Sequence, residues 1–221
     1  RLLDAEAEHL GRAEVQVFET EGLIGSGATP AVLSYLFHRI EDRFDGRPTL
    51  VIVDEGWLAL DDQGFAGQIR EWLKTLRKKN ASVLFATQSL ADIDGSAIAP
   101  AIIESCPTRL FLPNERALEP QIAAIYRRFG LNDRQIEILS RATPKRDYYC
   151  QSRRGNRLFE LGLSDVALAF TAASSKTDQA AIAGALANDD PDGFAATWLR
   201  LKGLVWAANL LTTTKEAPDD R

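Results

Sequence analysis

Apolar and polar positions in the first half of the chain alternate between the period of strands and the period of helices. Short apolar runs predict strands, and longer segments with apolar residues every three or four positions predict helices. The expected strands cover residues 13–24, 49–53, 82–89 and 108–114. The expected helices between them cover residues 31–44 and 65–76. Apolar strands that alternate with helices indicate a parallel α/β sheet with helices on both faces.

The ends of the two helices carry residues typical of helix termini. Thr29 and Pro30 suit the cap and the first turn of the helix over 31–44. The helix over 65–76 closes with RKKN, residues 77–80, and a basic end suits the negative pole of the helix dipole.

The second half of the chain has a different character. LEPQIAAIYRRFG predicts a helix ended by Gly130, and NDRQIEILSRA predicts one capped by Asn132. YYCQSRRGNRLFELGL predicts a hairpin whose turn is centred on residues 154–156. Two more helices are expected, over residues 174–188, where Ser175 caps, and over 190–211.

Composition narrows the functional classes. The chain has 26 basic and 31 acidic residues, a formal charge of −5, so its bulk charge gives no support for a nucleic-acid partner. Its two cysteines, Cys106 and Cys150, predict neither a disulfide framework nor a zinc site. The two histidines have no partner at ligand spacing, and no apolar run is long enough for a membrane span.

The most informative stretch is TLVIVDEGW, in which an apolar strand runs directly into Asp54 and Glu55. Adjacent carboxylates repel each other and need a cation, a proton in transit or a positively charged substrate. ATPases place such a pair beside the nucleotide, where the aspartate holds Mg²⁺ through water and the glutamate polarises the attacking water. Strand ends also meet solvent, so an ordinary acidic strand end is the alternative.

Two further residues fit the same chemistry. Gln88, at the tip of the next apolar strand, can sense a γ-phosphate or position water. Arg77, at a helix end, can be offered to a neighbouring subunit's nucleotide, where a guanidinium offsets charge on the transferred phosphoryl group. A solvated basic helix terminus is the alternative for Arg77.

Five stretches, taken together, resemble the TrbE/CagE-like ATPases of type IV secretion and conjugal transfer. They occur in family order, and the likeness runs from about residue 13 to residue 210. The stretches are VIVDEGW, LRKKNASVLFATQSLADI, AIIESCPTRLFLPN, IYRRFGL and KRDYYCQSRRGNRLFELGL. The resemblance implies a RecA-like fold of the additional-strand P-loop NTPase class, incomplete at its N-terminal side and followed by a C-terminal hairpin and helical region.

The resemblance also implies roles for individual residues. Asp54 and Glu55 become the Walker B acids, with Mg²⁺ held by Asp54 through water, while Gln88 becomes the sensor and Arg77 the trans-acting arginine. Weaker candidates for contacts at a subunit interface are Lys145, Arg146, Arg153 and Arg154. A solvated turn is the alternative for the arginines of the hairpin.

One motif of the family is absent. The phosphate-binding loop GxxxxGK[ST] does not occur, since GLIGSGATP (22–30) lacks a lysine and ASSKTD (173–178) lacks the preceding glycine loop. We therefore expect the chain to be the C-terminal half of an ATPase domain, which its first residue, arginine rather than methionine, also suggests. ATP and Mg²⁺ are expected to bind the intact protein and not this chain tightly.

These observations lead to an expected organisation and three functional hypotheses. Residues 1–170 are expected to form the Walker B half of the ATPase domain, 171–212 a helical pair and 213–221 a disordered tail. The first hypothesis is part of an ATPase that powers channel or pilus assembly, or substrate movement. The others are a non-catalytic interaction module of the secretion apparatus and a hexameric DNA translocase. The resemblance implies a hexamer in the bacterial cytoplasm, at the inner membrane beside other channel subunits, with DNA as a further candidate partner.

Overall fold

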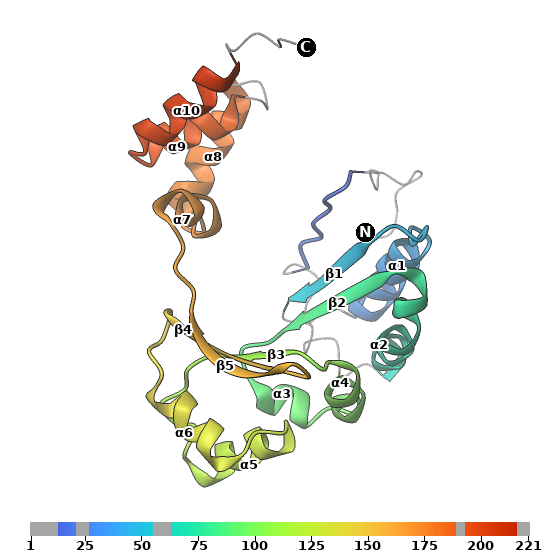
Figure 1. The fold of residues 1–221 in the computed structure, drawn as a ribbon. Helices are drawn as coiled ribbons and strands as arrows, with labels where there is room; N and C mark the ends of the chain where they lie inside the picture. The colour runs from blue at the N-terminus through green and yellow to red at the C-terminus, as the bar shows by residue number, and fades with distance from the viewer. Residues whose placement is uncertain (1–12, 21–26, 55–62, 189–192, 216–221) are drawn as a thin grey trace. The chain divides into compact units, whose positions relative to one another are not determined.

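The computed structural model describes residues 13–20, 27–54, 63–188 and 193–215. The chain divides into two compact units, Arg1–Phe159 and Glu160–Arg221. Each unit has its own cluster of buried apolar side chains (Figure 1). The domain boundary predicted at residue 170 stays a prediction.

A pair of parallel strands organises the first unit. β1 (Thr49–Asp54) and β2 (Ala81–Ala86) run side by side, with Thr49 opposite Ala81 and Asp54 opposite Ala86. The connection between them contains the helix α2 (Gln63–Thr75) and the 3₁₀ helix η2 (Leu76–Lys79). The strands predicted over 49–53 and 82–89 and the helix between them are therefore confirmed, although β2 ends before Thr87.

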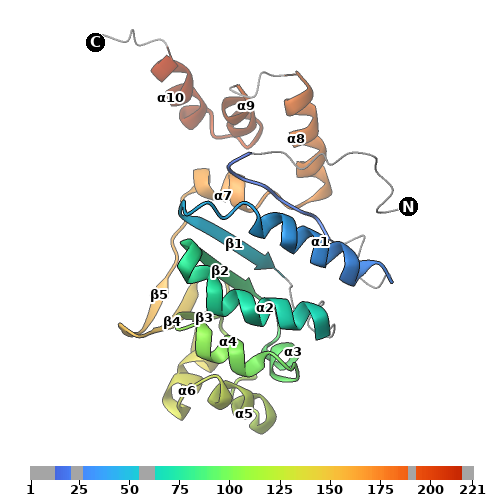
Figure 2. The same ribbon diagram turned by 90° about the vertical axis from the view of Figure 1, so that its right-hand side faces the viewer.

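The helices α1 (Thr29–Glu41) and α2 lie on the same side of these strands (Figures 1 and 2). Pro30 stands in the first turn of α1 as predicted, but Ala28 occupies the N-cap position and Thr29 is already helical, so the predicted cap is wrong. Packing between the helices centres on Trp72, whose ring lies 4.4 Å from that of Phe37. Its Nε1 donates a hydrogen bond to Glu41 at 3.3 Å.

Glu41 also joins the end of α1 to the residues that precede β2. Lys79 Nζ donates to Glu41 Oε1 at 2.6 Å, and this bond is the main cause that lowers the pKa of Glu41 below its usual value. Asn80 follows in the left-handed conformation, with φ of 56°, and turns the chain into β2. The basic end predicted for this helix is thus present and partly ion-paired.

The two faces of the parallel strands differ. Val51, Val83 and Phe85 pack against the core of the first unit. The alternate residues are exposed, at 59% for Leu50, 62% for Ile52 and 46% for Leu84. Helices were predicted on both faces, and those for this second face are not among the described residues.

The third predicted strand joins a different sheet. β3 (Arg109–Phe111) pairs antiparallel with β4 (Asp147–Ser152), and β5 (Gly155–Glu160) completes the order β3-β4-β5. The expectation that residues 108–114 extend the parallel sheet is therefore wrong. The reason is local: Arg109 donates to the carbonyl oxygens of Ile103 and, at 2.7 Å, Phe129, which fixes β3 between these helix ends.

Two other predictions of strand structure need correction. The hairpin forms, but its turn is Arg153–Arg154 rather than residues 154–156, because Gly155 with φ of 120° already begins β5. The described part of the strand predicted over 13–24, residues 13–20, has no strand structure. Val15 and Val17 are 82% and 88% exposed there, so the alternation has no sheet to pack on.

Helices surround the antiparallel sheet in the first unit. Their bounds are α3 Leu90–Asp94, α4 Ala99–Ser105, α5 Pro120–Arg128 and α6 Asp133–Arg141. Gly130, with φ of 87°, follows the end of α5 as predicted. Asn132 caps α6 and forms a capping box with Gln135, at 2.9 Å and 2.8 Å.

The second unit consists of helices in its described part. They are α7 (Asp165–Thr171), α8 (Lys176–Asn188), α9 (Phe194–Leu201) and α10 (Val205–Lys215). The core holds Ala169, Ala196, Leu199, Ala207 and Ala208. Trp198, 1% exposed, donates from Nε1 to the carbonyl of Ala169 at 2.9 Å. No described helix is both long and apolar enough to cross a bilayer.

The single helix predicted over residues 190–211 is wrong, because it is two helices. Gly203 adopts a φ of 76°, and the chain reverses there through a 2.8 Å bond from Leu204 N to Leu199 O. Ser175 Oγ accepts a bond from Asp178 N at 3.0 Å, so the predicted cap of α8 is confirmed. α10 continues to Lys215, past the predicted start of the tail at 213, and residues 216–221 lie outside the described ones.

Candidate functional site

Two predicted site residues lie at the same edge of the parallel strands. Asp54 is the last residue of β1, and its register partner Ala86 is the last residue of β2. Gln88 follows two residues later in a bend. Both side chains are exposed. Carboxyl ends of adjacent parallel strands are where ligands bind in open α/β sheets, so the structure puts a carboxylate and an amide at such an edge.

Local hydrogen bonds shape the loop that carries Gln88. Thr87 Oγ1 accepts from Ser89 N at 3.2 Å and donates to Ser89 O at 3.1 Å. Ser89 Oγ in turn accepts from Ala91 N at 3.2 Å and caps α3. The polar residues on either side of Gln88 thus hold the backbone of the loop and fix where its amide stands relative to the strand ends.

The predicted Glu55 lies outside the described residues, so the acidic pair is seen through Asp54. The donor set fits Mg²⁺ in part, because carboxylate and amide oxygens are hard ligands. Mg²⁺ commonly takes one or two carboxylates and completes its shell with water and substrate phosphates. Asp54 would hold the ion in this way, and Mg²⁺ would supply charge stabilisation for the phosphates.

A metal site formed by side chains alone is not present in the part of the chain that the structure describes. No group of three or more His, Cys, Asp or Glu residues there could hold an ion. Cys106 is a free thiol, and burial raises its pKa above the usual range. It is therefore protonated at neutral pH and a poor nucleophile.

Arg77 lies at the opposite end of the strands from Asp54 and Gln88. It belongs to η2, and β2 begins four residues later, at Ala81. The six residues of β2 span roughly 20 Å, which exceeds the reach of an arginine side chain. Within one chain, the structure does not bring Arg77 to the acidic edge.

The four weaker interface candidates fall into two pairs, one at each end of β4. Lys145, with φ of 64°, and Arg146 lie in the exposed turn before β4, where Arg146 is 3.9 Å from Asp147 Oδ1. Arg153 and Arg154 form the exposed hairpin turn after β4.

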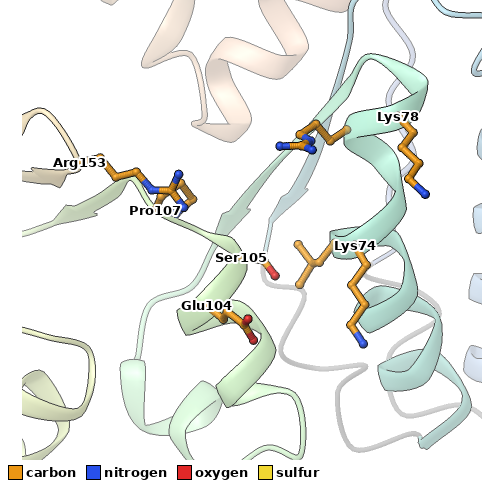
Figure 3. Close-up of a pocket in the computed structure, with 8 residues that line it drawn as sticks. Lys74, Lys78, Glu104, Ser105, Pro107 and Arg153 are labelled. Carbon is orange, nitrogen blue, oxygen red and sulfur yellow. The ribbon is translucent and has the colours of Figure 1, made fainter.

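A basic hollow brings Arg77 and Arg153 together (Figure 3). It has a volume of about 340 Å³, and its lining includes Lys74, Lys78 and Glu104. Sequence reasoning missed Lys74 as a companion of Arg77. The signal was available, because positions 74, 77 and 78 have the spacing that places side chains on one face of a helix. The nearness of the hairpin had no such signal.

Comparisons with known proteins match most of the chain. A family model described as the TraG P-loop domain matches residues 31–153. The chain is 46% identical over 212 residues to a probable conjugal transfer protein TrbE of Sinorhizobium fredii, covering 95% of this chain and 32% of that protein. It is also 46% identical to the conjugal transfer protein TrbE of Rhizobium radiobacter, over 95% of this chain and 26% of that protein.

A more distant relative is the type IV secretion system protein virB4 of Bartonella quintana. The identity is 35% over 173 residues, which cover 76% of this chain and 21% of that protein. The chain thus spans a third or less of these relatives' own lengths. The matched model covers more than half of the chain and agrees with the α/β architecture and with the predicted resemblance. The chain therefore belongs to the TraG P-loop domain family and is a homologue of the TrbE and VirB4 proteins of conjugal transfer and type IV secretion.

Proposed function

We propose that this chain is the Walker B half of an ATPase that powers conjugal transfer or type IV secretion. The observation that carries the proposal is the placement of Asp54 and Gln88 at the carboxyl ends of adjacent parallel strands. Membership of a P-loop domain family supports nucleotide with Mg²⁺ as the ligand.

Each residue at this edge has a distinct task in the proposed mechanism. Asp54 holds Mg²⁺ through water, and Glu55 orients and polarises the water that attacks the γ-phosphate. Gln88 donates or accepts a hydrogen bond at the γ-phosphate or at that water. Because the chain has no GxxxxGK[ST] loop, the lysine and backbone N–H groups that hold the phosphates come from another part of the whole protein.

Arg77 acts in trans in this proposal. The roughly 20 Å of β2 between Arg77 and the acidic edge supports a role at a neighbouring copy's nucleotide rather than at its own. There its guanidinium offsets the charge that develops on the phosphoryl group. A closed ring of copies, a hexamer, gives every site such a neighbour.

The partners in the proposal are other subunits of the secretion or conjugation channel, beside the bacterial inner membrane on its cytoplasmic side. The names of the relatives as components of conjugal transfer and type IV secretion systems support it. Two alternatives remain distinct: a module that docks on a complete ATPase without turnover, and a DNA translocase, whose DNA binding would fall steeply with salt.

The test is Glu55→Gln in the whole protein. The amide keeps the shape of the carboxylate but removes its negative charge, so ATP binding is retained and hydrolysis is lost. Binding is measured with a fluorescent ATP analogue and hydrolysis by phosphate release. Hydrolysis at the parent rate would refute the Walker B assignment. This chain alone, compared with a version extended upstream, separates the module: if neither binds ATP, the interaction module is favoured.

A further inference from the structure

Two adjoining hollows on the first unit form one basic surface. The first, about 340 Å³, lies between α2, η2, α4 and the hairpin, and the second, about 400 Å³, lies under the hairpin itself. They share Pro107 and Arg153 in their linings, so they are continuous. We call this surface the basic groove and define it by its cationic residues: Lys74, Arg77, Lys78, Arg153, Arg154 and Arg157.

The charge of the basic groove is opposite to that of the chain. Against its six cationic side chains, the described lining holds one carboxylate, Glu104, although the net charge of the chain is −5. In the described part of the chain, no carboxylate lies within 4.0 Å of any of the six. Arginines elsewhere in the unit are paired, such as Arg128 with Asp94 and Arg134 with Glu137.

The fold gathers these cations from two separate segments (Figure 3). Trp72 and Leu76 are buried in the core, which turns Lys74 and Lys78 to the outside of the same helix. Like charges four residues apart destabilise a helix, so this pair costs stability unless an anion lies between them. The groove therefore carries a repulsion that the fold itself does not relieve.

The hairpin side of the groove is built by the tight turn. Ser152 Oγ accepts from Arg154 N at 3.2 Å and donates to Gly155 O at 3.0 Å, which stabilises the turn that displays Arg153 and Arg154. Arg157 lies over the ring of Phe159, 6.0 Å from its centroid. The cations are thus held on a defined backbone rather than on a long loop.

We propose that the basic groove binds the phosphate backbone of a nucleic-acid strand without regard to sequence. Cations spread over two continuous hollows suit a polymer of phosphates better than a single anion. Among the described residues that line the hollows, none is aromatic, so bases have no side chain on which to stack. Hydroxyls of Ser105, Thr108 and Ser152 add neutral donors for phosphate oxygens. This proposal goes beyond the ATPase and does not depend on Asp54 or Glu55.

The experiment measures the salt dependence of DNA binding by the full chain, without nucleotide. Fluorescence anisotropy follows a labelled single strand of about 30 nucleotides between about 50 and 200 mM potassium chloride. The test variant is Arg153→Gln/Arg157→Gln, which avoids Arg77. The control is Arg134→Gln/Arg141→Gln, which changes the net charge equally at two exposed arginines that pair with Glu137.

Loss of two phosphate contacts lowers the slope of log K against log salt by about 1.4 for a single strand, or about 1.8 for a duplex. The control keeps the parent slope, and circular dichroism checks that each variant is folded. If the test variant does not fold, Lys74→Gln/Arg154→Gln replaces it, with the same slope change expected. No binding by the parent at the lowest salt, or an unchanged slope in the test variant, overturns the proposal.

Two further outcomes identify other occupants. Inorganic triphosphate that displaces the strand far more effectively than chloride at equal ionic strength would mean that the groove takes the phosphates of a nucleotide. Self-association that is lost in the Arg153→Gln/Arg157→Gln variant, with DNA affinity unchanged, would mean that the groove binds acidic residues of a second copy. Either result overturns nucleic-acid binding and leaves the Glu55→Gln test unaffected.

Discussion

Replacement of Trp72 by phenylalanine tests whether the first unit depends on its own core. Trp72 is 2% exposed, and its ring lies 4.4 Å from Phe37 and 5.8 Å from Phe44. Its Nε1 donates to Glu41 at 3.3 Å. Phenylalanine keeps a six-membered ring at the site but removes the hydrogen-bond donor and part of the buried volume.

The expected loss of stability has two parts. The hydrogen bond contributes about 1 kcal/mol, because its acceptor is charged but the bond is long and Glu41 keeps its bond from Lys79. The unfilled volume costs about 1 to 1.5 kcal/mol, a fraction of the roughly 3–5 kcal/mol lost when a buried tryptophan is truncated to alanine. We therefore expect a free energy of unfolding lower by about 2 to 2.5 kcal/mol.

Urea unfolding followed by far-ultraviolet circular dichroism measures this loss, and Trp198→Phe is the matched control. Trp198 is 1% exposed and donates to Ala169 O at 2.9 Å in the second unit. Each variant lowers the midpoint of the transition of its own unit and leaves the other transition in place. A shift of the whole curve by either variant would refute separate cores, and a loss for Trp72→Phe below about 0.5 kcal/mol would refute the packing argument.

Two other predictions concern the strand tips and the end of α1. Ser89→Ala removes the cap of α3 and lowers the free energy of unfolding by about 1 kcal/mol; it also slows ATP hydrolysis by the whole protein, measured by phosphate release, because the loop of Gln88 loses its support. Since Lys79 lowers the pKa of Glu41, this pair stabilises the fold above the unfolded pKa of about 4.5 and stops doing so as pH falls through the lower folded value. Lys79→Gln therefore weakens the acid-side fall of the urea midpoint, and an unchanged pH profile would contradict this.

The sequence predicted β1, β2 and α2 because their signals are local. Apolar runs and helical spacing are written within a few residues, and parallel pairing then brings Asp54 and Gln88 to one edge. The pairing of β3 could not be predicted in this way, since its three residues would look the same in either sheet. Its place is decided by bonds from Arg109 to carbonyl groups 6 and 20 residues away.

The same distinction explains the other differences. Gly203 breaks a segment whose apolar spacing continues without interruption, because a positive φ is a backbone property that the spacing does not report. The alternation of Val15 and Val17 predicted a strand, but a strand needs a neighbour that the pattern does not specify. The basic groove, too, depends on the hairpin lying beside α2, which only the tertiary fold determines.

The position of Arg77 connects the two proposals. It lines the basic groove, at the end of β2 opposite the acidic edge. If Arg77 acts on a neighbour's nucleotide, then a strand held by Arg153 and Arg157 lies beside the contact between copies. A bound polyanion there changes the field around Arg77, and by linkage the nucleotide of the neighbour changes the affinity for the strand equally. Nucleic acid and ATP would then be coupled through a single arginine, without any contact between the strand and Asp54.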